Sequence, residues 1–78
     1  MPVLRLFGPA REAAGVGVAE VEGATVAEVM ASAVDRYGER FAAVAATCKV
    51  WVDAEPAGPA SVVPPGSEVA LLPPVSGG

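Results

Sequence analysis

The stretch Thr25–Gly38, TVAEVMASAVDRYG, carries the clearest structural signal in this chain of 78 residues. Thr25 followed three residues later by Glu28 is a capping box, in which the two side chains satisfy free amides at the start of a helix. Gly38 suits the left-handed conformation that ends many helices. Between them, apolar residues recur at helical spacing and form one face. They are Val26, Val29, Met30, Ala33, Val34 and Tyr37. The stretch therefore predicts an amphipathic helix over residues 26–37.

Four short segments with alternating apolar and polar residues flank this helix, two on each side. They are residues 2–8 (PVLRLFG), 18–23 (VAEVEG), 48–53 (CKVWVD) and 68–73 (EVALLP). Alternation is typical of strands with one buried face, so each is predicted as a strand, the first two pairing antiparallel as a hairpin. Residues 9–17 contain Pro9, Gly15 and Gly17 and are expected to form only the connection between them.

Two further segments complete the pattern. Residues 39–48 are expected to add a short helical turn. Residues 54–67 contain four prolines, so they are expected to hold turns and at most a short edge strand, because proline cannot donate a hydrogen bond to a neighbouring strand. The predicted order is strand, strand, helix, strand, short strand, strand.

This order suits an α+β fold in which one main helix crosses a mixed sheet of four to five strands. The connection through the helix allows the first and last strands to lie parallel in the centre of the sheet. This is the β-grasp, or ubiquitin-like, arrangement, although other small α+β folds also fit the pattern. There is no internal repeat, so a single domain over residues 1–78 is expected.

Composition excludes several classes of function. The net charge is −4, with scattered acids, which argues against a nucleic-acid-binding protein. One cysteine, Cys48, allows neither an internal disulfide nor a cysteine-rich zinc site, and it is predicted to be a small buried hydrophobic residue. No apolar run approaches the roughly 20 residues of a membrane span. The N-terminus does not resemble a secretory signal, so a soluble cytoplasmic protein is expected.

The chain contains no histidine, the commonest general base and metal ligand. A Ser-His or Cys-His catalytic pair is therefore impossible. We expect no metal site, no bound cofactor and no catalytic machinery contained wholly in this chain. The segment Gly15-Val16-Gly17 lacks the third glycine of a dinucleotide-binding loop, and a hairpin turn is the preferred interpretation.

The strand patterns also predict an apolar patch on the face of the sheet away from the helix. Strand alternation directs Phe7, Trp51 and Leu72 to that face, which a single helix leaves uncovered. Exposed apolar patches usually mark interaction sites. The alternative is that the proline-rich segment 54–67 folds back and covers them. The residues expected to face the helix are Leu4, Leu6, Val50, Val52, Val69 and Leu71.

The chain ends in LLPPVSGG, residues 71–78. Pro73 and Pro74 cannot continue a sheet interior and favour an extended path, and residues 73–78 could reach roughly 20 Å. Val75, Ser76, Gly77 and Gly78 would form a slim arm that ends in an unhindered carboxylate. If a partner used ATP to convert this carboxylate to an acyl-adenylate, it would become an acyl electrophile. The alternative is a disordered end with no role.

The segments VLRLFGPAREAAG and PPGSEVALLPPVSGG, together with the chain length, resemble the small sulfur-carrying subunits of molybdopterin synthase, the MoaD group of the MoaD/ThiS ubiquitin-like family. Pro73–Gly78 is the most specific part of the resemblance. Members often have Asp-Gly-Asp where this chain has Pro65-Gly66-Ser67. They often have aromatic residues in place of Leu71 and Leu72.

The resemblance implies a carrier role for the C-terminus. A ubiquitin-activating-like enzyme would adenylate Gly78 with ATP and magnesium, and a sulfurtransferase or cysteine desulfurase would supply sulfur for a thiocarboxylate. The tail, residues 75–78, would enter the large catalytic subunit of molybdopterin synthase and pass sulfur to cyclic pyranopterin monophosphate. Phe7 and Leu72 would contact that subunit in a hetero-oligomer. Trp51, Pro73 and Pro74 complete the expected partner-binding surface.

Two alternatives remain at this stage. The chain could carry sulfur for another pathway, namely cysteine or thiazole synthesis, and a cysteine-synthesis carrier can end in a similar way. It could also be a ubiquitin-like modifier or binding module without a sulfur role.

Overall fold

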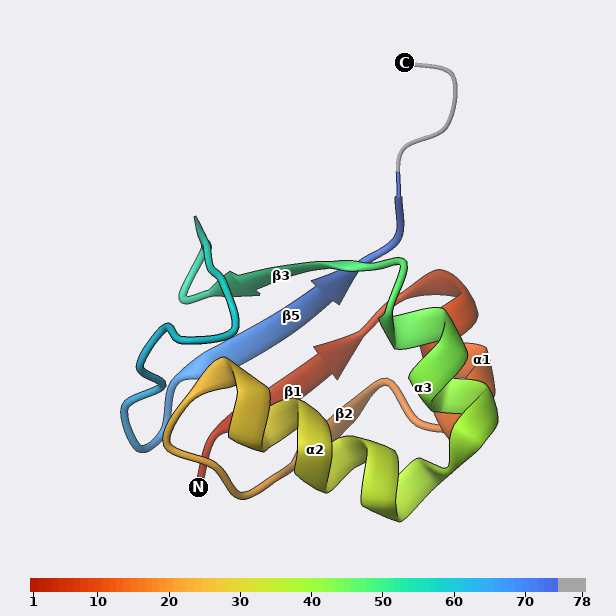
Figure 1. Ribbon diagram of the computed structural model, residues 1–78, viewed down its shortest axis with the longest axis horizontal. Coiled ribbons are helices and arrows are strands. Elements are labelled where there is room, and N and C mark those ends of the chain that lie inside the picture. The colour runs from red at the N-terminus through yellow and green to blue at the C-terminus, as the bar shows by residue number, and fades with distance from the viewer. Residues whose placement is uncertain (75–78) are drawn as a thin grey trace.

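The computed structural model describes residues 1–74 of the chain and contains a sheet packed against helices (Figure 1). In chain order the elements are β1 (Val3–Leu6), α1 (Gly8–Ala14), β2 (Val18–Glu20), α2 (Val26–Tyr37), α3 (Glu39–Ala45), β3 (Lys49–Val52), β4 (Glu55–Pro56) and β5 (Glu68–Leu72). The predicted helix over residues 26–37 is confirmed with the same bounds, as α2.

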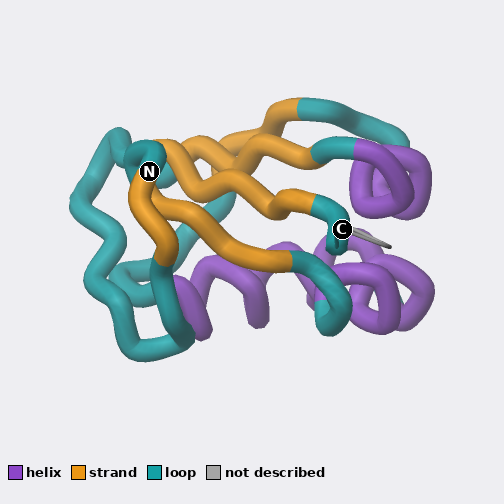
Figure 2. Tube along the Cα trace, turned by 90° about the horizontal axis from the view of Figure 1, so that it is seen from above, coloured by secondary structure: helices purple, strands orange, loops and turns teal. Residues whose placement is uncertain are grey.

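Within residues 1–74 the sheet has five strands, in the order β2-β1-β5-β3-β4. β1 and β5 are parallel in its centre, β2 pairs antiparallel with β1, and β3 pairs antiparallel with β5. α2 crosses one face of the sheet, and α1 and α3 pack together at one end (Figures 1 and 2). The predicted β-grasp arrangement is confirmed.

The core lies between the sheet and the helices. Leu4, Leu6, Val69 and Leu71 are buried from the strand side, as the alternation predicts. Val50 and Val52 pack against the same core and are partly buried. From the helix side come Val26, Val29 and Ala33 of α2 and Phe41 of α3. Burying each large apolar side chain contributes roughly 1.5–3 kcal/mol, so α3 is held mainly by Phe41.

The prediction that residues 9–17 form only a connection is wrong, because Gly8–Ala14 is a helix. Pro9 lies in its first turn, where its missing N–H costs no hydrogen bond. Gly15 follows the helix with φ of 80°, and its N–H donates to the Arg11 carbonyl at 2.8 Å. Proline and glycine therefore mark the two ends of α1 rather than an irregular segment. Ala10 is its buried residue.

Other predicted bounds needed smaller corrections. The second strand ends at Glu20 and not at residue 23, although the Val21 N–H still donates to the Pro2 carbonyl at 3.0 Å. The antiparallel pairing of the first two strands is confirmed, but α1 joins them in place of a hairpin turn. The expected turn after residue 38 is the helix α3. The short edge strand expected in the proline-rich segment is β4.

The free backbone N–H groups at the start of α2 find hydrogen-bond acceptors in the capping box and in the proline-rich segment. Thr25 Oγ1 accepts from the Glu28 N–H at 3.2 Å, and Glu28 Oε1 accepts from the Ala24 N–H at 3.0 Å. The carbonyls of Pro59 and Ser61 accept from the next two free amides of the helix, both at 3.0 Å. Residues 57–63 therefore pack on the helix side of the sheet. The alternative in which this segment covers the opposite face is wrong.

Candidate docking face and tail root

The sheet brings the predicted patch residues together on the face away from α2. Leu72 is the last residue of β5 and pairs with Lys49, while Trp51 pairs with Ala70 of the same strand. Phe7 directly follows β1, whose Leu6 pairs with Leu71, so the register places Phe7 beside Leu72. Phe7 is 41% exposed, and Trp51 and Leu72 are half-buried. We call Phe7, Trp51, Leu72, Pro73 and Pro74 the docking face.

The chain leaves the sheet at Pro73, which we call the tail root and which lies against the turn that starts α1. Pro73 is half-buried, and a Cβ placed on Gly8 would lie 3.7 Å from its Cγ. Gly8 has φ of +53°, a conformation that disfavours other residues, and the lack of a side chain leaves room for Pro73. Pro74 is exposed. The remaining predicted tail residues, Val75, Ser76, Gly77 and Gly78, lie outside the described residues.

Of the basic residues on the same face, Arg5 forms an ion pair and Lys49 does not within residues 1–74. Arg5 Nε donates to Glu68 Oε2 at 2.6 Å, and both side chains are about half exposed, so the pair is expected to contribute no more than about 1 kcal/mol. Lys49 is exposed and has no ion-pair partner among residues 1–74. The sequence interpretation overlooked Lys49. The signal was present, because it is the only lysine in the chain and shares strand parity with Trp51.

A second overlooked residue, Asp53, ties β3 to the start of β5. Its carboxylate accepts from the Ser67 hydroxyl at 2.7 Å and from the Glu68 N–H at 2.9 Å. Its own N–H donates to the Glu68 carbonyl at 2.9 Å. The hydrogen bond from the Glu68 backbone, with a smaller contribution from Ser67, lowers the pKa of Asp53 below its usual value. This contact fixes the register of β5 and hence the position at which the tail begins.

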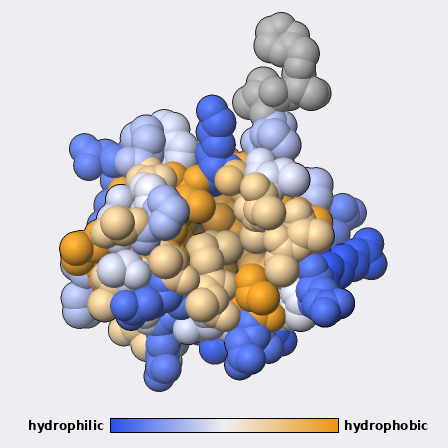
Figure 3. Space-filling view, in the orientation of Figure 1, coloured by the Kyte–Doolittle hydropathy of each residue, from blue (hydrophilic) through white to orange (hydrophobic). Residues whose placement is uncertain are grey.

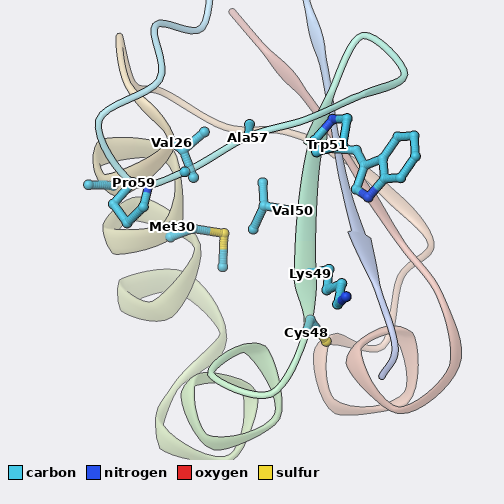
Figure 4. Close-up of a pocket in the computed structure, with 11 residues that line it drawn as sticks. Val26, Met30, Cys48, Lys49, Val50, Trp51, Ala57 and Pro59 are labelled. Carbon is cyan, nitrogen blue, oxygen red and sulfur yellow. The ribbon is translucent and has the colours of Figure 1, made fainter. Parts of the chain in front are cut away.

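An apolar cleft of about 440 Å³ lies on the other face, between α2, β3 and residues 56–59. Met30 and Val50 point into it, whereas Trp51 lies on the opposite side of β3 (Figure 4). Apolar surface gathers over this region in the space-filling view (Figure 3). The sequence did not predict this cleft, because its walls come from segments far apart in the chain.

Cys48 lines one end of this cleft and is partly buried, close to the expected small hydrophobic residue. Its Sγ donates to the Val44 carbonyl at 3.4 Å. Burial raises the pKa of the Cys48 thiol despite an opposing hydrogen bond with Thr47. The reactive thiolate is thereby disfavoured.

Residues 1–74 contain no cluster of three or more acidic or cysteine side chains suited to holding a metal ion. No helix in the same part is both long and apolar enough to cross a membrane.

Comparison with known proteins identifies relatives of the whole chain. A sequence model described as the ThiS family matches residues 4–78. Comparison with curated protein sequences gave no significant match.

Solved structures share the fold with this chain, three of them as follows. SAMP1 from Haloferax volcanii is 27% identical with a TM-score of 0.76, covering 99% of this chain and 98% of that one. The BexX/CysO complex from Amycolatopsis orientalis contains a chain 24% identical, with a TM-score of 0.84 and full coverage of both chains. The complex of subunits 1 and 2 of molybdopterin-converting factor from Helicobacter pylori 26695 contains one 22% identical, with a TM-score of 0.72, covering 99% and 97%.

Proposed function

The chain belongs to the ThiS family, and from this membership we propose that it is a sulfur carrier whose Gly78 carboxylate is converted to a thiocarboxylate. The family match extends to residue 78 and so includes the terminal Gly77-Gly78. An unhindered terminal carboxylate is the group that such a carrier must present.

The observation that carries this proposal is the place where the chain leaves the sheet. β5 lies in the centre of the sheet and passes at Leu72 into Pro73, which rests against Gly8 beside the docking face. A partner that covers Phe7, Trp51 and Leu72 would therefore hold the root of the tail. Six residues beyond Leu72 span roughly 20 Å when extended, enough to enter a partner's active site.

This chain supplies the carboxylate and the docking face, and its partners supply the chemistry. An adenylating enzyme with ATP and magnesium would join the Gly78 carboxylate to AMP. A sulfur donor such as a sulfurtransferase or cysteine desulfurase would then attack with its persulfide and displace AMP, which gives an acyl disulfide. A thiol of a partner would reduce the S–S bond of this intermediate, leave the thiocarboxylate on Gly78 and be oxidised to a disulfide. No group of this chain is required as a catalyst, which is consistent with its lack of histidine.

The pathway that we assign first is molybdenum cofactor biosynthesis. In this assignment, the chain is the small subunit of molybdopterin synthase and donates sulfur to cyclic pyranopterin monophosphate in the large catalytic subunit. Its support is the similarity of residues 3–15 and 64–78 to that group, together with the structural likeness to a subunit of the Helicobacter complex.

A second candidate is a carrier for cysteine synthesis, favoured by the ending Leu71–Gly78 and by the likeness to a chain of the BexX/CysO complex. Thiazole synthesis is a third candidate pathway for a ThiS-family carrier. A ubiquitin-like modifier remains a candidate through the likeness to SAMP1, a small archaeal modifier protein by name. If the chain is a sulfur carrier, its C-terminus should be converted to a thiocarboxylate. If it is a modifier, its C-terminus should form an amide bond with a target protein.

Intact-mass measurement tests the carrier role. The chain would be incubated with an adenylating enzyme of this type, ATP, magnesium and a sulfur source. We expect the exchange of one oxygen for sulfur at Gly78, and no exchange in a variant that lacks Gly78 but keeps the native circular dichroism spectrum. An unchanged mass in the wild-type chain contradicts the proposal.

The thiocarboxylated chain then tests the pathway. It would be mixed with a molybdopterin synthase large subunit and the pyranopterin precursor, and separately with a thiocarboxylate-dependent cysteine synthase. Molybdopterin formation with consumption of the thiocarboxylate supports the first assignment. Sulfur transfer only in the second reaction overturns it in favour of the second candidate.

A further inference from the structure

We propose that the outer edge of β3, together with the apolar cleft beside it, binds an extended segment of a partner protein in which an acidic residue lies between two apolar residues. This site lies apart from the tail and goes beyond the proposed function. The segment would add to the sheet as a short strand, a mode of recognition in which backbone hydrogen bonds hold the peptide and alternate side chains select it.

The outer edge of β3 is only partly covered. β4 pairs with the second half of the strand, and the Ala57 N–H donates to the Val50 carbonyl at 2.9 Å. The chain then turns towards α2, where the Pro59 carbonyl accepts from the Ala27 N–H at 3.0 Å. In residues 1–74, no strand therefore continues the sheet beside the first half of β3.

This uncovered edge presents backbone groups that can pair with another strand. Val50 bonds outward to Ala57, so its neighbour Lys49 directs its own N–H and carbonyl towards β5. The N–H and carbonyl of each trans peptide point in opposite directions, so the Cys48 carbonyl and the Val50 N–H point outward. Within residues 1–74 that carbonyl has no donor and that N–H has no acceptor.

The apolar cleft lies directly beside this edge. Its volume of about 440 Å³ falls in the range of about 300–1,000 Å³ that is typical of ligand pockets. Val50 and Met30 point into it, and α2 forms the opposite wall (Figure 4). Successive side chains of a strand point to opposite faces of a sheet, so an added strand would direct every second side chain into the cleft. Those side chains should be apolar.

The residue between them would lie opposite Lys49. Figure 4 shows the Lys49 side chain on the side of β3 away from Met30 and the cleft. Lys49 is exposed, and no ion pair within residues 1–74 holds its ammonium. Residues directly opposite each other on neighbouring strands share a face, with Cβ atoms about 4.5–5.5 Å apart, and opposite charges there attract. The edge therefore selects an apolar, an acidic and an apolar residue in turn.

The open backbone groups favour an extended segment over a small apolar molecule or a partner helix. Either of those could fill the cleft, but it would cover the Val50 N–H without supplying an acceptor, which is costly. β5 lies between β3 and β1, so Phe7 at the end of β1 stays accessible when the edge is occupied. A partner could thus hold the chain at β3 while another contacts Phe7.

The probe is a panel of blocked peptides Thr-Φ-Asp-Φ-Thr, in which each Φ is Val, Ile, Leu or Phe, and a second panel with Lys in place of Asp. Binding to the full, isotope-labelled chain is followed by NMR. We expect at least one Asp peptide to bind with a Kd below about 1 mM. It should slow hydrogen exchange of the Val50 N–H and shift the Met30 methyl signal. The matching Lys peptide should bind about 5-fold more weakly.

Variants separate the two contributions, and each is checked for the native circular dichroism spectrum. Lys49→Glu reverses the charge at the edge and should reverse the preference between Asp and Lys peptides. Ala27 is exposed at the rim of the cleft, so Ala27→Trp should fill the cleft and abolish binding. Ala43→Trp makes the same change at an exposed position of α3 that does not line the cleft, and it should bind as the wild type does.

The inference is overturned if no Asp peptide binds, or if Ala27→Trp binds as tightly as Ala43→Trp. It is also overturned if a peptide shifts the Met30 signal without protecting the Val50 N–H, since the cleft would then take an apolar group without strand pairing. Equal binding of Asp and Lys peptides to the wild type contradicts the role of Lys49. None of these measurements uses the adenylating enzyme or the thiocarboxylate, so they fail or succeed independently of the proposed function.

Discussion

At the scale of single residues, Asp53 has a structural role that the charge pattern of the sequence does not indicate. In the sequence, Asp53 is only one of several scattered acids. Asp53 accepts two hydrogen bonds at the junction of β3 and β5, from the Ser67 hydroxyl and the Glu68 N–H. Nothing local in the sequence identifies these partners, which lie 14 and 15 residues away. They meet only when the two strands pair.

The lowered pKa of Asp53 predicts a pH-dependent contribution to stability. Because the folded chain favours the ionised form, this contribution is complete above the usual Asp pKa of about 3.9 and is lost as the pH falls through the lowered folded-state value. We expect Asp53→Asn to lower the urea midpoint of unfolding at neutral pH. The difference from wild type should narrow in strong acid.

Glu55→Gln is the matched control, since it removes the same charge from an exposed side chain two residues away that makes no hydrogen bond within the described residues. We expect its urea midpoint to stay near that of the wild type at both pH values. If Asp53→Asn lowered the urea midpoint by as much in strong acid as at neutral pH, the stabilisation would not depend on the ionised carboxylate of Asp53, and the prediction would be contradicted.

At the scale of elements, the sequence predicted the helix whose capping residues and apolar period both lie within its own segment. α2 was predicted with its observed bounds because the capping box and the apolar period agree within one segment. α1 was missed because Pro9 and Gly15 mark both irregular segments and helix ends. α1 has seven residues, too few to show a clear apolar period. Its helical form depends on tertiary packing, which includes the burial of Ala10 against the rest of the core.

The turn between β2 and α2 depends on Gly23 and gives a second prediction. Gly23 has φ of +154°, and a Cβ there would lie 2.5 Å from the Val29 nitrogen and 2.9 Å from the Glu28 carbonyl carbon. Two of the three nearest atoms belong to the backbone of α2, which cannot move aside without disturbing the helix. We expect Gly23→Ala to lower the free energy of unfolding by roughly 2–3 kcal/mol, measured by urea denaturation.

Gly58→Ala is the control for this change, because a Cβ at Gly58 would meet nothing within 4 Å. It should leave the free energy of unfolding within roughly 0.5 kcal/mol of the wild type, as surface substitutions usually do. If the two variants were equally stable, the close packing of the β2–α2 turn on α2 would not be a source of stability.

At the scale of the whole molecule, α2 and residues 57–63 lie on one face of the sheet, and α1 and α3 pack together at one end. In the described part of the chain, the opposite face is left open. The sequence predicted which side chains lie on each face, because successive residues of a strand point to opposite faces of the sheet. It could not predict the neighbours across strands, such as Lys49 beside Leu72, since those depend on the sheet order and register. The apolar cleft between α2 and β3 was missed for the same reason.

The open face leads to the last prediction, which concerns Phe7→Asp. Phe7 is 41% exposed and does not belong to the buried core cluster, so the change should leave the fold intact. In a complex, the aromatic ring would be buried by the partner, and a carboxylate in its place would lose its water. We expect affinity for the adenylating enzyme or the large subunit to fall by about 30-fold or more, which corresponds to about 2 kcal/mol.

Val62→Asp separates the docking face from exposed apolar residues in general. Val62 is 71% exposed, more than Phe7, but it lies in the proline-rich segment and bridges to Thr25 at the start of α2, on the helix side of the sheet. Calorimetric titration of both variants against the same partner should show a loss of affinity for Phe7→Asp alone. Equal losses would mean that binding depends on general surface hydrophobicity, and unchanged binding of Phe7→Asp would place the partner on another face. Because the tail root lies against Gly8, next to Phe7, a partner bound elsewhere would have to reach the tail without contacting its root.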